Sequence, residues 1–233
     1  MVTSNLAREG NLIKICVSLM VEQSDRVLEA MFKAEEVGAD LLEWRLDVTD
    51  DPDVAGVLRQ APLPVIATVR SIDQGGRFTG SKAEKLRLLL QAAENGCAYL
   101  DWEFRRGAAL PAELSRIKNR LILSYHNFQG TPSDEELSSL FQQMAETGAE
   151  VLKIVTRAQK KEDNLAILSL VGRGRRHGQK VVAFCLGPLG RISRVACLLV
   201  GGAFTYAALE TGAEAAPGQL TISEIRQALE LLR

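Results

Sequence analysis

A lysine stands inside an aliphatic, β-branched run, VLKIVT, at residues 151–156. Such a run is typical of a buried strand, where an unpaired ammonium group is costly and is usually paired or deprotonated. A neutral lysine amine attacks carbonyl carbons and forms a Schiff base. On these residues alone, a half-exposed strand with the Lys153 amine in solvent is the simpler explanation, so the rest of the chain must decide.

Polar residues also recur two positions apart in other strand-like runs, as in Glu43, Arg45 and Asp47. The others are Thr68 and Arg70, Asp101 and Glu103, and Ser124 and His126. Alternate side chains of a barrel strand share one face. Because helices cover the outer face of such a barrel, these groups are expected in its interior, near the carboxyl-terminal mouth where barrel enzymes carry their active sites.

Each polar set also has an ordinary explanation when taken alone. Glu43 and Arg45 would make a structural ion pair, and His126 would fit a hydrogen-bonded core histidine. Taken together, the sets favour a polar active site. In it, burial and nearby arginines would favour the uncharged Lys153 amine, and His126 is suited to carry protons near neutral pH. The residues therefore predict an imine-forming enzyme that acts on a ketone or aldehyde.

The elements that must position these residues alternate along the chain between strand-like and helical patterns. Eight strand-like runs occur, at 12–20, 41–48, 64–70, 99–104, 120–128, 151–156, 180–187 and 203–209. Helical segments such as 24–40 and 133–150 open on a serine N-cap and close at a Gly-Ala turn. The pattern predicts an α/β fold, a (β/α)8 TIM barrel. No GxGxxG follows a strand, and GRGRRHG (172–178) is interpreted as a helix end that Gly178 caps.

Composition limits the function classes. A formal net charge of -1 argues against nucleic acid or anionic membranes as partners and favours a small molecule. No apolar run is long enough to span a membrane and no signal peptide is recognised, so a cytoplasmic location is expected. The chain, 1–233, is interpreted as a single domain with a loose N-terminal segment at 1–11. The four cysteines are expected to be buried free thiols, and the two histidines do not suggest a zinc site.

Several strings, in their order and approximate spacing, resemble type I 3-dehydroquinate dehydratase from about residue 12 to about residue 230. They are EWRLD (43–47), TVR (68–70), DWEF (101–104), SYHNFQGTP (124–132), LKIV (152–155), GRISR (190–194) and APGQ (216–219). The resemblance implies dehydration of 3-dehydroquinate to 3-dehydroshikimate, the third step of the shikimate pathway, by syn elimination and without metal or organic cofactor. It implies that Lys153 forms the Schiff base and that His126 is the general acid and base.

The resemblance also assigns binding roles. Arg194 matches the residue that holds the substrate carboxylate, and Glu43, Arg45, Arg70 and Gln219 match residues that contact substrate or position the catalytic pair. Supporting roles are expected for Ser18, Asp101 and Glu103, of which Glu103 would support His126. Arg191 is placed outside the site.

Two positions depart from the family pattern: Gln74 stands where many members have Glu, and Ala215 where many have Ser. The following GGRF segment would fit either a lid or a plain surface turn. Two alternatives use the same barrel: a Schiff-base class I aldolase, and a non-catalytic sensor of quinate-pathway metabolites, which should have lost Lys153 or His126. A homodimer is expected, since two-fold dimers are the commonest assembly.

Overall fold

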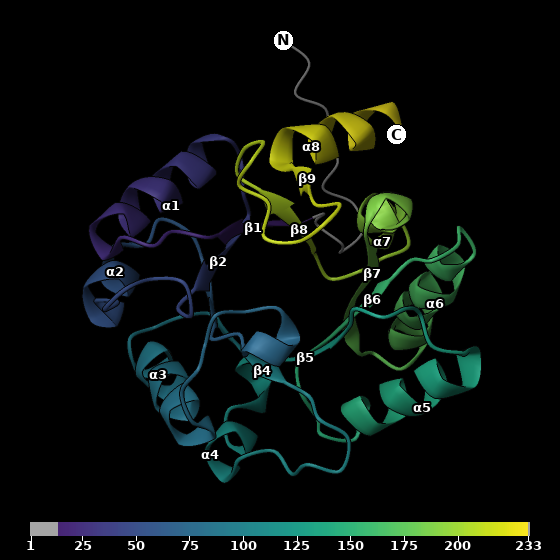
Figure 1. Cartoon of the computed structure of the whole chain (residues 1–233), viewed down its shortest axis with the longest axis horizontal. Helices are drawn as coiled ribbons and strands as arrows, with labels where there is room; N and C mark the ends of the chain where they lie inside the picture. Colours follow the sequence, from purple (N-terminus) through teal and green to yellow (C-terminus); the bar gives the residue numbers. More distant parts are fainter. Residues whose placement is uncertain (1–13, 233) are drawn as a thin grey trace.

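The computed structural model describes residues 14–232, so the predicted loose segment 1–11 lies outside the described residues. Parallel strands curl around a central axis with helices outside them (Figure 1), and the strand order is β7-β6-β5-β4-β3-β2-β1-β8-β9. The strands are β1 Ile15–Leu19, β2 Leu41–Arg45, β3 Val65–Thr68, β4 Tyr99–Glu103, β5 Leu121–Asn127, β6 Val151–Arg157, β7 Lys180–Leu186, β8 Thr205–Ala208 and β9 Leu220–Thr221. All eight predicted strands are confirmed, and β9 is a short addition.

Helices α1 to α7 occupy the connections between strands, and α8 follows the last strand. They are α1 Val27–Glu36, α2 Val54–Gln60, α3 Lys82–Glu94, α4 Ala112–Ser115, α5 Asp134–Ala145, α6 Asp163–Arg176, α7 Arg191–Leu199 and α8 Ile222–Leu231. Among these described helices, none is long and apolar enough to cross a membrane.

The predicted helix ends are partly confirmed. Ser133 caps α5 in a reciprocal capping box with Glu136, and Gly178 follows α6 with a φ of 66°. The N-cap expected at Ser24 is wrong, because a 3-10 turn precedes α1 and the Ser24 hydroxyl instead accepts a hydrogen bond from the Asp53 N–H, at 3.2 Å.

Alternation along the strands separates two apolar layers. One, which includes Trp44 and Leu42, fills the space between strands and helices, and the other, which includes Ile66, Ile122 and Val182, fills the interior of the curled sheet. Between β7 and β8 the Ala203 N–H donates to the Val181 carbonyl at 2.8 Å. The predicted α/β fold of the TIM-barrel type is confirmed, whereas the assignment of all of 1–233 to one domain stays a prediction.

The four cysteines, Cys16, Cys97, Cys185 and Cys197, are all buried and free, as expected.

Candidate active site

The predicted polar residues meet above the apolar interior layer. Parallel register places Glu43 beside Ser18, Asp101 beside Thr68, and Lys153 beside Ser124. A pocket of about 70 Å³ opens there. It is lined by the predicted residues Ser18, Glu43, Arg45, Arg70, His126, Lys153, Arg194 and Gln219, and also by Gln74 and Ala215.

Lys153 lies between two carboxylates rather than among arginines. Its Nζ is 3.3 Å from Oδ2 of Asp101 and 3.5 Å from Oε1 of Glu43, and it sits 4.1 Å from the ring centroid of Tyr206. Only 5% of the residue is exposed. Two carboxylates and an aromatic face therefore surround the amine. The expectation that arginines would dominate around Lys153 is therefore wrong, since its nearest charged neighbours are carboxylates.

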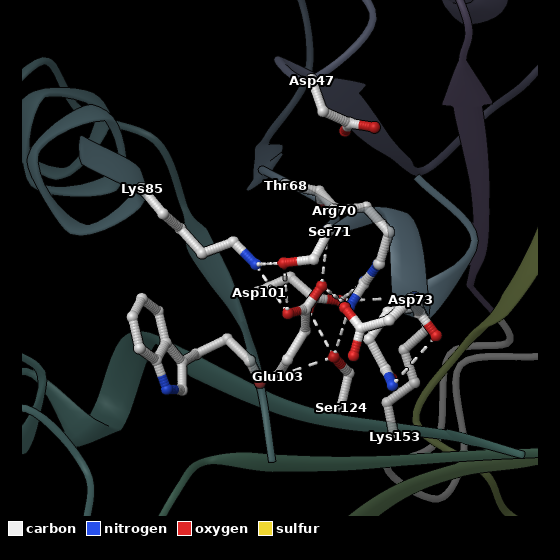
Figure 2. A network of polar contacts seen from close by, with 12 residues as sticks. Asp47, Thr68, Arg70, Ser71, Asp73, Lys85, Asp101, Glu103, Ser124 and Lys153 are labelled. Atoms are coloured by element: carbon white, nitrogen blue, oxygen red, sulfur yellow. Dashed lines mark hydrogen bonds and ion pairs between the residues drawn. The ribbon is translucent and has the colours of Figure 1, made fainter. Parts of the chain in front are cut away.

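A buried network fixes Asp101, one of the two carboxylates that contact Lys153 (Figure 2). Arg70 pairs with Asp101 at 2.7 Å, and Ser124 donates to Asp101 at 2.6 Å while accepting from Arg70 at 2.7 Å. Burial raises the pKa of Asp101, but Arg70 and Lys153 outweigh it and hold that pKa far below its usual range. Asp101 is thus a permanent anion in this site.

Glu43 is held in a similar way from the two flanking strands. Ser18 donates to Glu43 at 2.8 Å, and Thr68 donates to it at 3.0 Å. Arg45 makes a two-pronged ion pair with Asp47, at 2.9 and 2.8 Å, so its planar fork is held at the edge of the pocket.

His126 is suited to act as a base. Burial lowers its pKa well below the ordinary value, and the Arg70 and Lys153 cations lower it further. Its ring stacks on Phe128 at a centroid distance of 6.0 Å. Nδ1 is buried and has no hydrogen-bond partner within residues 14–232. The imidazole is therefore neutral near pH 7 and has a nitrogen free to take a proton.

Arg194 is a buried cation that pairs with no anion among residues 14–232. It lies in the first turns of α7 and is 1% exposed, with its guanidinium carbon 4.4 Å from the Phe184 ring centroid. Nε and Nη2 find no hydrogen-bond partner in the described part of the chain. Burial lowers the pKa of Arg194 to about 10. A desolvated guanidinium facing a pocket is suited to bind a carboxylate. Arg191 on the same helix instead pairs with Glu224 at the surface.

The segment between β8 and β9 also contributes to the pocket, through Ala215, Ala216 and Gln219. Gln219 is 7% exposed, and its side-chain oxygen accepts the Ala215 N–H at 2.6 Å. Gln219 thus shapes this segment and has its amide NH₂ left for a ligand. Ala215 also lines the pocket but offers only a methyl group.

Glu103 does not support His126, and this expectation is corrected. Its carboxylate accepts the Ser71 N–H at 2.8 Å and the Ser71 hydroxyl at 2.9 Å, and it pairs with Lys85 of α3 at 2.7 Å (Figure 2). No hydrogen bond joins Glu103 to His126 among residues 14–232. Glu103 is the last residue of β4, so its carboxylate lies at the end of the strand, where it reaches Lys85 of α3 rather than the histidine.

Glu103 and Lys85 thereby tether the β3–α3 loop, defined as residues 69–81. Ser71 begins the 3-10 turn η2 (Ile72–Gln74), and Gln74 and Gly75 line the pocket. The loop is also closed on itself, since the Phe78 N–H donates to the Arg70 carbonyl at 3.0 Å. This geometry resembles a fixed cover over the pocket more than a plain surface turn.

Replacing Glu103 with Gln should destabilise the protein by roughly 3 kcal/mol, because it leaves the buried Lys85 ammonium without its anion. The double variant Lys85→Met/Glu103→Gln should lose less than the sum of the two single variants, since neither charge is then stranded. Urea unfolding of the four proteins measures the coupling. If the double variant instead loses as much stability as the two single variants together, the Lys85 and Glu103 charges are not coupled and the pair does not tether the loop.

The sequence did not identify two aromatic walls of the site, Tyr206 and Phe184. Tyr206 is buried, its hydroxyl lacks a partner within residues 14–232, and burial raises its pKa. The only sequence signal for Tyr206 as a site residue was its inward position in the run 203–209. An apolar residue of the barrel interior would have the same position, so this signal does not distinguish the two.

Comparison with known proteins is consistent across sequence and structure. The family model described as type I 3-dehydroquinase matches residues 15–233. The 3-dehydroquinate dehydratase of Thermococcus onnurineus is 40% identical over 206 residues, which cover 88% of this chain and 93% of the relative. That of Desulfotalea psychrophila is 35% identical over 217 residues, covering 91% and 95%. The crystal structure of 3-dehydroquinate dehydratase from Geobacillus kaustophilus superposes with a TM-score of 0.84 at 28% identity, covering 96% of this chain and 92% of that one.

Proposed function

The chain belongs to the type I 3-dehydroquinase family, lyases of the shikimate pathway, and on this premise we propose that it dehydrates 3-dehydroquinate to 3-dehydroshikimate through an imine on Lys153. One observation carries the proposal: a buried lysine held between two carboxylates shares a pocket with a neutral histidine and an unpaired arginine. These are the groups needed to make an imine, move a proton and hold a carboxylate.

Imine formation would begin when Lys153 gives up one proton to solvent and its amine attacks the substrate ketone. The resulting carbinolamine takes a proton on its oxygen and loses water. Ammonium plus ketone thus becomes iminium plus water, with no net change in charge or protons. Asp101 and Glu43 stabilise the cationic nitrogen at both ends of this step, because each lies within 3.5 Å of Nζ.

Elimination would follow from the electron demand of the iminium, which acidifies the neighbouring C–H. His126 removes that proton, and the electron pair forms an enamine. The enamine then expels the β-hydroxyl group, to which His126 returns the proton, so one water leaves. Hydrolysis of the conjugated iminium releases the enone and regenerates Lys153. A single histidine on one face of the substrate gives syn elimination.

Arg194 would hold the substrate carboxylate and fix the ring against Lys153. Glu43, Arg45, Arg70 and Gln219 would contact the hydroxyl groups or position the catalytic pair, and Ser18 and Asp101 would support them. Gln74 takes the place of a carboxylate in many relatives; its Oε1 is buried without a partner in the described residues. A neutral amide there adds no negative charge to this part of the pocket.

Arg194→Gln should lower kcat/KM by about 10³-fold, because two charge-assisted hydrogen bonds to the substrate carboxylate are lost. The free protein should be at least as stable as wild type, since a buried unpaired charge is removed. Steady-state kinetics and thermal unfolding measure both effects. Arg191→Gln, on the same helix but at the surface, is the matched control and should leave kcat/KM unchanged. A loss of stability without a loss of kcat/KM would place Arg194 in the fold rather than the site.

The activity itself is tested by incubating the purified protein with 3-dehydroquinate in the presence of a chelator and following the ultraviolet absorbance of the conjugated enone. Accumulation of 3-dehydroshikimate supports the proposal. Absence of product with a folded protein would contradict it and favour a sensor; carbon–carbon cleavage products would favour an aldolase.

We propose that the protein works in the cytoplasm as a homodimer, at the third step of the pathway. Four buried free thiols suit a reducing compartment, and a two-fold dimer is the commonest assembly. Sedimentation velocity at several concentrations tests the dimer; a single monomeric species would rule it out.

A further inference from the structure

A second cavity lies outside the barrel, behind the loop tether. It has a volume of about 260 Å³ and is bounded by the start of α3, the end of β4 and the segment 108–110 before α4. Figure 1 shows α3 and α4 on the outer side of the strands here. The cavity exists because α4 is one short turn, Ala112–Ser115, where the neighbouring α3 and α5 have 13 and 12 residues. So short a helix leaves part of the outer face of β4 and β5 uncovered.

The walls of this cavity are apolar and its charged groups are mostly basic. Aromatic and aliphatic side chains line it: Phe78, Trp102, Phe104, Leu110 and Leu123. The amines of Lys82 and Lys85 lie 5.8 and 5.9 Å from the Trp102 ring centroid. Arg105 also lines the cavity, and Glu103 is the one carboxylate among its lining residues. Arg105 pairs with Asp73 and Lys85 pairs with Glu103, each at 2.7 Å, so the excess of positive charge at the cavity comes from Lys82.

We propose that this cavity is a second binding site, for a small organic anion that carries an apolar ring, and that its occupancy acts on the active site. The ring would contact the walls around Trp102 and Phe104, and the anionic group would face Lys82 and Lys85. Apolar walls with a few convergent charged groups are typical of small-molecule sites. The excess of cations selects an anion over a neutral or cationic ring.

The coupling follows from one shared residue. Lys85 contacts Glu103 and the Ser71 hydroxyl, each at 2.7 Å, and Ser71 begins the turn that carries Gln74 into the active pocket (Figure 2). An anion in the cavity competes with Glu103 for Lys85. Binding would therefore loosen the tether of the β3–α3 loop and weaken the active site, and substrate would weaken anion binding by the same factor.

Fluorine NMR with 4-fluorobenzoate as the probe tests the site without reference to activity. Lys82→Glu should weaken probe binding by about tenfold, since a cation becomes an anion at the cavity. Lys161→Glu, an exposed lysine elsewhere, is the matched control and should not. Arg194→Gln alters only the active pocket. It should therefore leave 4-fluorobenzoate binding in the second cavity, the binding that Lys82→Glu weakens, unchanged. The neutral analogue 4-fluorobenzyl alcohol should bind more weakly than the anion.

The coupling is measured on the wild-type and Lys82→Glu proteins in the dehydratase assay. Saturating 4-fluorobenzoate should lower wild-type kcat/KM by about fivefold and should have little effect on Lys82→Glu, whose own activity should match wild type. The proposal would be overturned if Lys82→Glu left the affinity for 4-fluorobenzoate unchanged, or if Arg194→Gln abolished the binding. It would also be overturned by binding that is sensitive to Lys82→Glu but leaves kcat/KM unchanged. An inactive wild-type protein would contradict the dehydratase assignment, while the NMR result would still decide the binding site.

Discussion

Replacing Lys153 with Ala should reduce kcat by about 10⁴-fold or more, the scale of loss seen when an enzyme loses its covalent nucleophile. The reason is specific to the imine. Without the amine no cationic nitrogen forms at the substrate ketone, so the neighbouring C–H stays weakly acidic and His126 is too weak a base to remove it. The measurement is the rate of enone formation at saturating 3-dehydroquinate.

Lys153→Arg is the matched control for charge. A guanidinium keeps a cation against Asp101 and Glu43, so this variant should stay closer to wild type in stability than Lys153→Ala, which takes the paired cation from buried Glu43 and leaves Asp101 with Arg70 alone. Arginine cannot form the imine, and both variants should be inactive. Substantial activity in Lys153→Arg would mean that the lysine acts only through its charge.

Replacing His126 with Ala should lower kcat by about 10³- to 10⁴-fold, since this one residue serves as both base and acid. Elimination needs a base that removes a proton from carbon, whereas imine formation does not. The His126→Ala protein should therefore still trap substrate as an adduct on Lys153 while turning it over slowly. Loss of both trapping and turnover in a folded variant would show that His126 is needed earlier than proposed.

The pH profile offers an independent test of the same residue. The free enzyme needs neutral His126, and burial with the nearby Arg70 and Lys153 cations lowers its pKa well below the ordinary value. As pH falls, kcat/KM should therefore decline only at a pH well below the ordinary histidine pKa, as His126 takes up a proton. A decline centred near the ordinary histidine pKa of about 6.5 would indicate that His126 is exposed to solvent in the working enzyme.

Strand positions and the fold class could be predicted from the sequence because both rest on local patterns. Each strand is a short apolar run, and polar residues two apart must share a face. This is why Glu43, Asp101 and Lys153, far apart in the chain, could be placed together. The short α4 could not be foreseen, since the segment 105–120 has no clear periodicity to show how little of it is helical.

The contacts between residues of the site were harder to predict than which residues belong to the site. Arginines were expected to dominate around Lys153, yet carboxylates are its nearest charged neighbours, because parallel register decides which residues of adjacent strands meet. Glu103 was assigned to His126 from its face of the strand, but it ends β4 and pairs with Lys85 of α3. Alternation gives a residue's face and does not give its height along the barrel or its partner.

The most direct test of the account is to trap the imine. The protein is incubated with 3-dehydroquinate and borohydride in the presence of a chelator, digested, and mapped by mass spectrometry, with Lys153→Ala treated in parallel. A reduced adduct on the peptide that carries Lys153, absent from the variant, is the predicted result. Accumulation of the enone product with no adduct on Lys153 would contradict the account, because the elimination would then proceed without an imine.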